Sequence, residues 1–170
     1  MGNLLDDTDR KILDLLQRDA RKTNAAIAAE VGLTGPSVFE RIRKLEQRGV
    51  IRGYRVDVNP AAVGRPLTAF IRLTAAFDEK YGSGVRAISQ DPDVRELYNV
   101  AGEDCFIIKT QVDAPEALEA LLHRIRRCIT VQRSVTMIAL SALKEGGPLN
   151  VLDAPPAPEV RAKNGARPRR

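Results

Sequence analysis

The feature that most constrains the fold is a pair of short helical patterns between Thr23 and Leu45, separated by Gly32. Thr34 takes the N-cap position of the second helix, and Pro36 falls in its first turn, where the missing N–H removes no intrahelical bond. The pattern predicts two short helices that cross at the glycine and share one core. Its predicted apolar positions are Ile27, Val31, Leu33, Val38, Ile42 and Leu45.

Basic side chains gather around this unit. Residues 21–55 contain eight basic and three acidic residues, whereas the first twenty residues contain three basic and five acidic ones. A short capped helix crossing another at a glycine-containing turn can enter the major groove of DNA, and phosphate contact requires cationic charge. We therefore predict a helix-turn-helix that binds double-stranded DNA. The alternative is a helical hairpin whose charges only form a solvated face.

The outward side of the second helix supplies the candidate DNA contacts. Ser37 and Glu40 carry groups that can bond base edges, while Arg43 and Lys44 can meet phosphate or guanine. Arg41 is expected on the flank of this surface. The full set of expected DNA contacts is Thr23, Thr34, Gly35, Pro36, Ser37, Glu40, Arg41, Arg43 and Lys44.

Flanking patterns extend the unit in both directions. Three aspartates at positions 6, 7 and 9 precede an apolar stripe with helical spacing. Because the N-terminal end of a helix carries partial positive charge and favours acidic residues, this pattern predicts a further helix. Gly49 is expected to end the second of the two helices, the one predicted to contact DNA. Residues 50–58 then alternate as a strand that stops at Asn59-Pro60. Three helices followed by a strand predict a winged helix-turn-helix.

The second half of the chain predicts a different architecture. Its periodicities follow the order βαββαβ, which gives an antiparallel four-stranded sheet with two helices on one face, the ferredoxin-like arrangement. The strands are expected at 67–77, 94–100, 105–112 and 131–143, and the helices at 80–90 and after Asp113-Ala114-Pro115. Apolar residues on both registers of the first and last strands indicate a second buried face, which predicts a homodimer.

The expected fold class is thus α+β with two domains. Beyond residue 147 the composition shifts to Pro, Ala and Arg, which cannot bury enough apolar surface to become ordered. That end is either an extra electrostatic contact to DNA or an inert terminus. The predicted divisions are a helix-turn-helix domain (1–50), a strand linker (51–64), a ferredoxin-like domain (65–147) and a disordered basic tail (148–170).

Other chemistry is sparse in the sequence. His123 is the only histidine and has no Cys or carboxylate at a metal-ligand spacing, so we predict no metal site and a histidine that is on a helix surface or partly buried. The two cysteines fit a reducing cytoplasm. No run of about 20 apolar residues and no signal peptide is recognised, so we expect a cytoplasmic protein without a membrane span. Without a phosphate-cradling glycine motif or a nucleophile elbow, neither a cofactor nor an enzyme activity is predicted.

Several motifs resemble the Lrp/AsnC family, the leucine-responsive or feast/famine regulators, over residues 4 to about 145. The resemblance implies a transcriptional regulator tuned by an amino acid or related small metabolite, in dimers that commonly assemble further, often to octamers. Two rival functions stay open: an architectural DNA-binding protein of low sequence specificity, and a ligand-binding assembly module. The motifs are Leu5-Asp6-Asp7-Thr8-Asp9-Arg10-Lys11-Ile12-Leu13, Val31-Gly32-Leu33-Thr34, Glu40-Arg41-Ile42-Arg43-Lys44-Leu45-Glu46 and Gly49-Val50-Ile51-Arg52-Gly53-Tyr54.

The resemblance also implies an effector site at a contact between dimers. In the family, a glycine-containing turn and a hydroxyl-bearing stretch on the last strand line an amino-acid pocket. N–H groups of Gly102 and Glu103 would hold a carboxylate, and Glu103 or Asp104 an ammonium. This sequence departs from one common pattern because Cys105 stands where many relatives carry an aspartate. The alternative is an ordinary hairpin turn and ordinary strand residues. The implied effector residues are Gly102, Glu103, Asp104, Cys105, Ser134 and Thr136.

Overall fold

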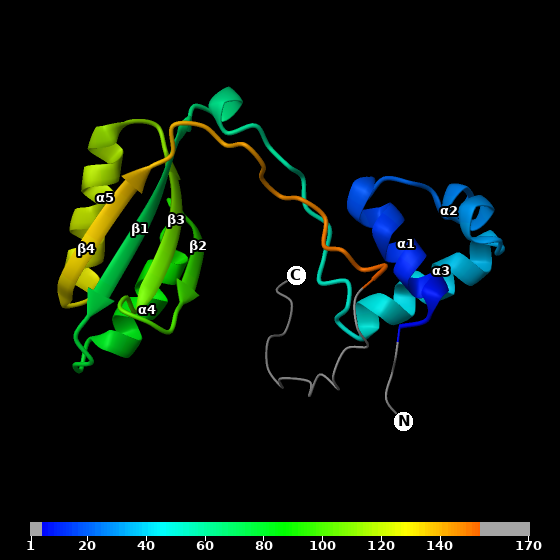
Figure 1. Cartoon of the computed structure of the whole chain (residues 1–170), viewed down its shortest axis with the longest axis horizontal. Coiled ribbons are helices and arrows are strands. Elements are labelled where there is room, and N and C mark those ends of the chain that lie inside the picture. Colours follow the sequence, from blue (N-terminus) through cyan, green and yellow to red (C-terminus); the bar gives the residue numbers. More distant parts are fainter. Residues whose placement is uncertain (1–4, 154–170) are drawn as a thin grey trace. The chain divides into compact units, whose positions relative to one another are not determined.

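The computed structural model describes residues 5–153, which divide into two compact units (Figure 1). Of the described residues, the first unit contains 5–56 together with 144–153, and the second is Asp57–Leu143. Most of the predicted basic tail, residues 154–170, lies outside the described residues. Among the helices that are described, none is long and apolar enough to cross a membrane.

Three helices form the first unit, and side chains cap each start. Asp6 accepts a hydrogen bond from the Asp9 N–H at 2.7 Å, and the Thr23 and Thr34 hydroxyls accept from the third N–H after each. Gly32 ends the second helix with φ of 70°, a left-handed conformation that favours glycine. The predicted helix-turn-helix is therefore confirmed. The helices are α1 (Asp7–Arg18), α2 (Asn24–Val31) and α3 (Gly35–Gln47).

The core of this unit uses the stripe predicted from the sequence. Ile27, Val38 and Leu45 are at most 1% exposed. Val31, Leu33 and Ile42 pack against the core in partly buried positions. Ile12 of α1 completes the same cluster. Because these residues turn one side of α3 toward α1 and α2, the opposite side of α3 is left to solvent.

The strand predicted after α3 is not formed. Residues 52–59 contain no regular structure, and a single 3₁₀ turn, η1 (Ala61–Val63), follows. Val56 is 86% exposed. Alternation of apolar residues signals a strand only where a neighbouring backbone completes the ladder. Within residues 5–153, no strand pairs with this segment, so it remains a linker without a paired wing.

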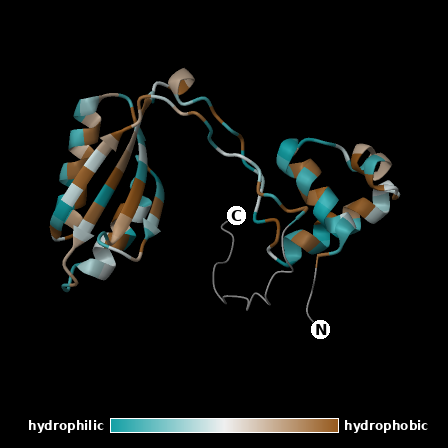
Figure 2. Cartoon of the chain, in the orientation of Figure 1, coloured by the Kyte–Doolittle hydropathy of each residue, from teal (hydrophilic) through white to brown (hydrophobic). Residues whose placement is uncertain are grey.

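The second unit has the predicted βαββαβ order. Its strands form one antiparallel sheet in the order β2-β3-β1-β4, as in a ferredoxin-like fold. Figure 2 shows hydrophobic residues (brown) recurring along the strands between more hydrophilic ones (teal). The elements are β1 (Leu67–Ala75), α4 (Tyr81–Gln90), β2 (Val94–Asn99), β3 (Phe106–Val112), α5 (Pro115–Cys128) and β4 (Val131–Ile138).

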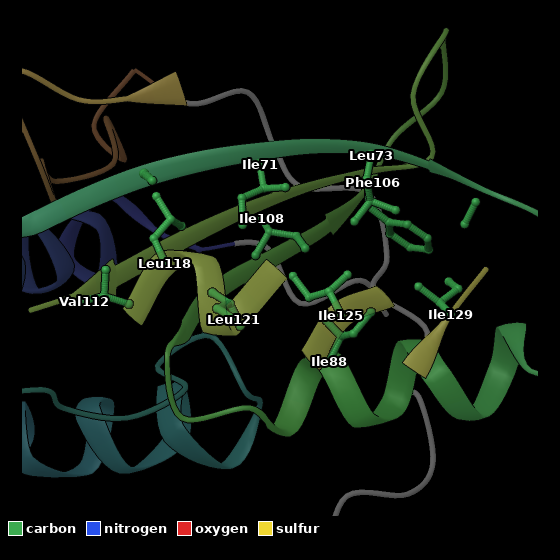
Figure 3. Close-up of a cluster of buried hydrophobic side chains, with 12 residues drawn as sticks. Ile71, Leu73, Ile88, Phe106, Ile108, Val112, Leu118, Leu121, Ile125 and Ile129 are labelled. Atoms are coloured by element: carbon green, nitrogen blue, oxygen red, sulfur yellow. The ribbon is translucent and has the colours of Figure 1, made fainter. Parts of the chain in front are cut away.

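One face of the sheet packs against both helices. Ile71 and Ile108 are register partners in β1 and β3, and both are fully buried. Figure 3 shows these side chains meeting Ile88 from α4 and Leu121 from α5 in one cluster. Since successive strand residues point to opposite faces, the residues between them form a second, open face.

The last strand is shorter than predicted. Residues 131–143 were expected in it, but β4 ends at Ile138, and the final bond of the ladder joins the Ala139 N–H to the Thr68 carbonyl. Pro66 precedes β1 and has no N–H to extend the ladder.

The predicted disordered tail also begins too early. Residues 148–153 contact α1 through backbone hydrogen bonds to polar side chains. A segment that binds a helix through backbone hydrogen bonds needs no apolar core of its own, so composition does not predict this contact.

Candidate nucleic-acid interface and effector site

A hollow lies between the outer side of α3 and Asp9 of α1. This cavity has a volume of about 490 Å³, and five of the nine predicted DNA contacts line it. The hollow therefore brings together five residues that were predicted individually, whereas Thr23, Thr34, Gly35 and Arg43 do not line it. Its lining residues are Asp9, Pro36, Ser37, Glu40, Arg41, Lys44, Leu45 and Arg48.

The start of α3 is shaped for close approach. The Thr34 hydroxyl lies 2.9 Å from that of Ser37, so these two predicted contacts act as one polar group in the free protein. Gly35 and Pro36 follow the cap with little bulk. The helix N-terminus carries partial positive charge and favours anions such as phosphate. Thr23 lies apart from this group, as the exposed N-cap of α2.

Charged groups in the middle of α3 partly neutralise one another. Arg43 donates to the Glu40 carboxylate from Nη2 at 2.8 Å and from Nε at 3.2 Å, one helical turn away. Both side chains are about half exposed. Lys44 is exposed and lines the hollow. The outward face thus presents one acidic and two basic groups that can exchange partners when DNA arrives.

Arg41 is turned toward α1. Its Nη1 lies 2.6 Å from Asp6 Oδ2 and 2.8 Å from Asp9 Oδ1. Asp9 is only 7% exposed, and partial burial of the Asp6 carboxyl acts to raise its pKa. The hydrogen bonds from the Asp9 N–H and from Arg41 outweigh that burial, so the pKa of Asp6 is lowered. Arg41 therefore positions α3 against α1, a role that sequence reasoning missed.

Replacing Arg41 tests this positioning role. Arg41→Met keeps much of the side-chain length but leaves the nearly buried Asp9 carboxylate without its partner, so we expect a loss of about 1–3 kcal/mol in the stability of this unit. Hydrogen exchange of α1 and α3 amides would measure it. In a double-mutant cycle, Arg41→Met combined with Asp9→Asn should cost less than the sum of the two changes. Strict additivity would contradict the ion pair.

Acid should weaken the same contact. Because the pKa of Asp6 is lowered in the folded state, its contribution to stability is present above the ordinary value of 3.8 and is lost as pH falls through the lowered value. We expect the helical unit to lose stability as pH falls from about 4 downward. The Arg41→Met variant should lose less over that range. Equal acid sensitivity of the two proteins, followed by circular dichroism, would argue against the assignment.

Phe39 is a further exposed residue that sequence reasoning passed over. It is 53% exposed on α3, one position from the buried Val38. The sequence did contain a signal for it. Phe39 lies off the apolar stripe, whereas the other large apolar residues of the helix occupy core positions. An exposed aromatic ring beside base-reading groups can contact a thymine methyl. Phe39 therefore joins the candidate DNA contacts.

The predicted effector turn is held by its own neighbours. Asp104, only 8% exposed, accepts hydrogen bonds from Arg72 Nε at 2.6 Å and Arg133 Nη2 at 3.3 Å. The bond from Arg72 lowers the pKa of the Asp104 carboxyl despite its partial burial, and Arg133 adds to the effect. Gly102 has φ of 145°. The Asp104 carboxylate is thus engaged by two guanidinium groups, whereas the neighbouring Glu103 carboxylate is 83% exposed and lies 3.6 Å from Arg133 Nη2.

The two predicted halves of the effector site do not meet in one chain. Ser134 and Thr136 are register partners of Leu73 and Ile71, so they share the core-facing side of the sheet. Arg133 alternates to the open side, where it reaches Asp104. The Cys105 thiol packs partly against the core.

The single histidine is placed as predicted, on a helix surface. His123 is 62% exposed on α5, with Nε2 3.8 Å from Glu119. In the described part of the chain, no three His, Cys, Asp or Glu side chains cluster as metal ligands.

Together these features define a class: a helix-turn-helix DNA-binding unit joined to a ferredoxin-like domain. Two family descriptions match the chain, "winged helix-turn-helix DNA-binding" over residues 5–52 and "Lrp/AsnC ligand binding domain" over residues 68–149. The chain is 36% identical to the HTH-type transcriptional regulator LrpA of Mycobacterium tuberculosis, over 81% of this chain and 92% of that protein. It belongs to the Lrp/AsnC family of transcriptional regulators, which are not enzymes.

Solved structures show the same architecture. An AsnC family transcriptional regulator from Agrobacterium tumefaciens superposes with a TM-score of 0.78 at 29% identity, covering 82% of this chain and 93% of that one. A feast or famine regulatory protein from M. tuberculosis, complexed with L-methionine, superposes with a TM-score of 0.76 at 37% identity. That match covers 83% of this chain and 95% of the other.

Proposed function

We propose that this protein is a sequence-specific transcriptional regulator that binds its operator as a dimer through α3, under the control of an amino acid or related metabolite. The observation that carries the proposal is the hollow along α3, where capped backbone, base-reading and cationic groups lie on one surface. Such a protein works in the cytoplasm, where it meets the chromosome.

The contacts divide by chemistry. Ser37 and Glu40 would read base edges, and Lys44 would bind phosphate. Arg43 would leave Glu40 for phosphate or guanine. Backbone approach would occur at the cap formed by Thr34, Gly35 and Pro36, with the Thr23 hydroxyl as a separate phosphate contact. Arg41 lines the same hollow and would hold α3 to α1 at the flank of the contact.

Binding to DNA upstream of the protein's own gene tests this function. Fluorescence anisotropy on that fragment and on a shuffled fragment, at one fixed salt concentration, gives the ratio of specific to non-specific affinity. We expect a ratio of at least about 1,000. A ratio near one would indicate an architectural DNA-binding protein of low sequence specificity. No binding at low salt would indicate a ligand-binding assembly module.

The open face of the sheet supports the dimer. Tyr98, Val135 and Met137 are 55%, 40% and 45% exposed, and all three lie on the side opposite the helices. Register places Met137 beside Phe70 and Tyr98 beside Ile107, so apolar groups recur across this face. A second copy with the same face would bury them by two-fold symmetry. Assembly beyond the dimer, to octamers, belongs to the same proposal.

Placing a charge on the open face tests that arrangement. Val135→Lys would bury two ammonium groups at a symmetric contact, and we expect the dimer dissociation constant to rise at least about 100-fold. Analytical ultracentrifugation measures it. Gln90→Lys, at the exposed end of α4, is the control and should leave the constant unchanged. A dimer equally stable in both variants would exclude this face as the contact.

The effector part of the proposal rests on the turn at Gly102–Cys105 and on the methionine-bound relative. The exposed Glu103 carboxylate would bind an ammonium group, with the turn N–H groups of Gly102 and Glu103 on the ligand carboxylate and Asp104 and Cys105 beside it. Ser134 and Thr136 would contribute only where dimers meet. A thermal-shift screen of the twenty amino acids should find one or a few that raise the melting temperature, because a ligand that binds only the folded state stabilises it. No shift at about 10 mM of any of them, on the millimolar scale of weak ligands, would remove this effector class.

A further inference from the structure

The segment after β4 returns to the DNA-binding unit. Packing assigns residues 144–153 to the first unit, although the family's ligand-binding domain is matched through residue 149. The chain therefore passes between the two units twice, once after Val56 and once before Lys144. We call residues 148–153 the C-terminal strap.

The strap is held on α1 by two polar side chains. Gln17 forms a two-bond clamp with one residue: its Oε1 accepts from the Leu149 N–H at 2.8 Å, and its Nε2 donates to the Leu149 carbonyl at 3.1 Å. Arg10 Nη1 donates to the Val151 carbonyl at 2.7 Å. A side-chain amide that satisfies both backbone groups of a residue imitates the edge of a strand. These bonds involve only backbone groups of the strap, and the Leu149 side chain stays 75% exposed.

The spacing of these contacts is regular. Arg10 and Gln17 are seven residues apart and so lie on one side of α1, about 10 Å along its axis. Leu149 and Val151 are two residues apart, about 7 Å in extended chain, and the long Arg10 side chain spans the remainder. The strap runs antiparallel to α1. Asn150 and Asp153 close it with side-chain and backbone bonds of 3.2 and 3.3 Å.

We propose that the C-terminal strap is a working part of the DNA-binding unit that restricts its motion and so strengthens operator binding. The strap binds α1, and α1 holds α3 through Arg41. When the strap is bound to α1, both chain segments that cross between the two units are attached to the DNA-binding unit. Without it, only the segment after Val56 is. A unit with less freedom loses less entropy when both copies in a dimer engage their half-sites. This inference rests on the proposed function of a dimeric operator-binding protein.

The first test asks whether the strap is bound in the full-length protein, without DNA. The Leu149 N–H should exchange with deuterium about ten-fold faster in Gln17→Ala than in the unmodified protein, because its acceptor is lost. Lys11→Ala is the matched control. It changes an exposed residue of the same helix, about 100° around the axis from Arg10, and should leave the rate within two-fold. A Leu149 N–H that exchanges like unstructured chain in the unmodified protein would overturn the proposal.

The second test asks whether the strap matters for DNA. Leu149→Pro removes the donor N–H, whereas Leu149→Ala removes only an exposed side chain. We expect operator affinity to fall about five- to ten-fold in Leu149→Pro and to stay within two-fold in Leu149→Ala. Equal affinities in the two variants, with the Leu149 N–H protected in the unmodified protein, would overturn the role in binding. Failure of the proposed function would differ, since the unmodified protein would then bind no operator.

Discussion

Lys44→Glu should abolish operator binding under conditions where the unmodified protein binds tightly. Lys44 is exposed on α3 and lines the hollow that gathers the predicted DNA contacts. Reversing its charge replaces an attraction to phosphate by a repulsion, about 1.5 kcal/mol per protomer. In the proposed dimer two protomers bind one operator, so affinity should fall at least about 100-fold.

The salt dependence separates this effect from misfolding. Loss of one phosphate contact per protomer should lower the slope of log affinity against log salt by about 0.9 for each contact. Arg86→Glu is the control, because it makes the same charge change on the exposed surface of α4 in the other unit. Ultracentrifugation should show the same oligomers for both variants. If Arg86→Glu weakened binding as much as Lys44→Glu, general charge rather than α3 would govern the interaction.

Gly84→Ala should destabilise the second unit more than any exposed substitution. Gly84 lies where α4 meets the end of α5, and an added Cβ would stand 2.2 Å from the Cys128 carbonyl oxygen and 2.9 Å from its carbon. These are backbone atoms, so the helices must separate. We expect a loss of about 3 kcal/mol in free energy of unfolding, although alanine by itself favours a helix. Exchange of β3 amides reports the stability of this unit.

Gly82→Ala supplies the matched comparison on the same helix. Apart from its chain neighbours and the backbone of its own helix, no described residue has a heavy atom within 4 Å of a Cβ added at Gly82, and its φ is not positive. The substitution should therefore stabilise the unit by about 0.5–1 kcal/mol, because alanine lowers the conformational entropy of the unfolded chain and has a higher helix propensity than glycine. Opposite signs at positions two residues apart would establish the close helix approach. Two changes of the same sign would refute it.

Local rules predicted the elements well because they act within a few residues. The Thr34 cap and the stripe through Val38 and Leu45 fixed α3 and the side it buries. In the second half, the order of periodicities was enough for the sheet, since few topologies accommodate βαββαβ. Both glycines of α4 weakened its helical signal, and only the structure reveals that Gly84 permits a close approach.

The errors concern partners far away in the sequence. Alternation in residues 50–58 could not tell whether a strand would find a neighbour. The predicted DNA contact at Arg41 stays a prediction, but its spacing gave no sign of its carboxylate partners, which lie 32 and 35 residues earlier. Residues 148–153 bind through their backbone, which leaves no mark in hydropathy. Each outcome depended on a contact that composition and period do not encode.

The ion pair between Glu40 and Arg43 bears on how the protein finds its target on a chromosome. Away from the operator, Glu40 both repels phosphate and keeps the guanidinium occupied, so random sequence gains little from this part of α3. Only a base that donates to the Glu40 carboxylate or accepts from the freed guanidinium compensates for separating the pair. We expect short dwell times on random sequence, and therefore a faster search among the many competing sites of a genome.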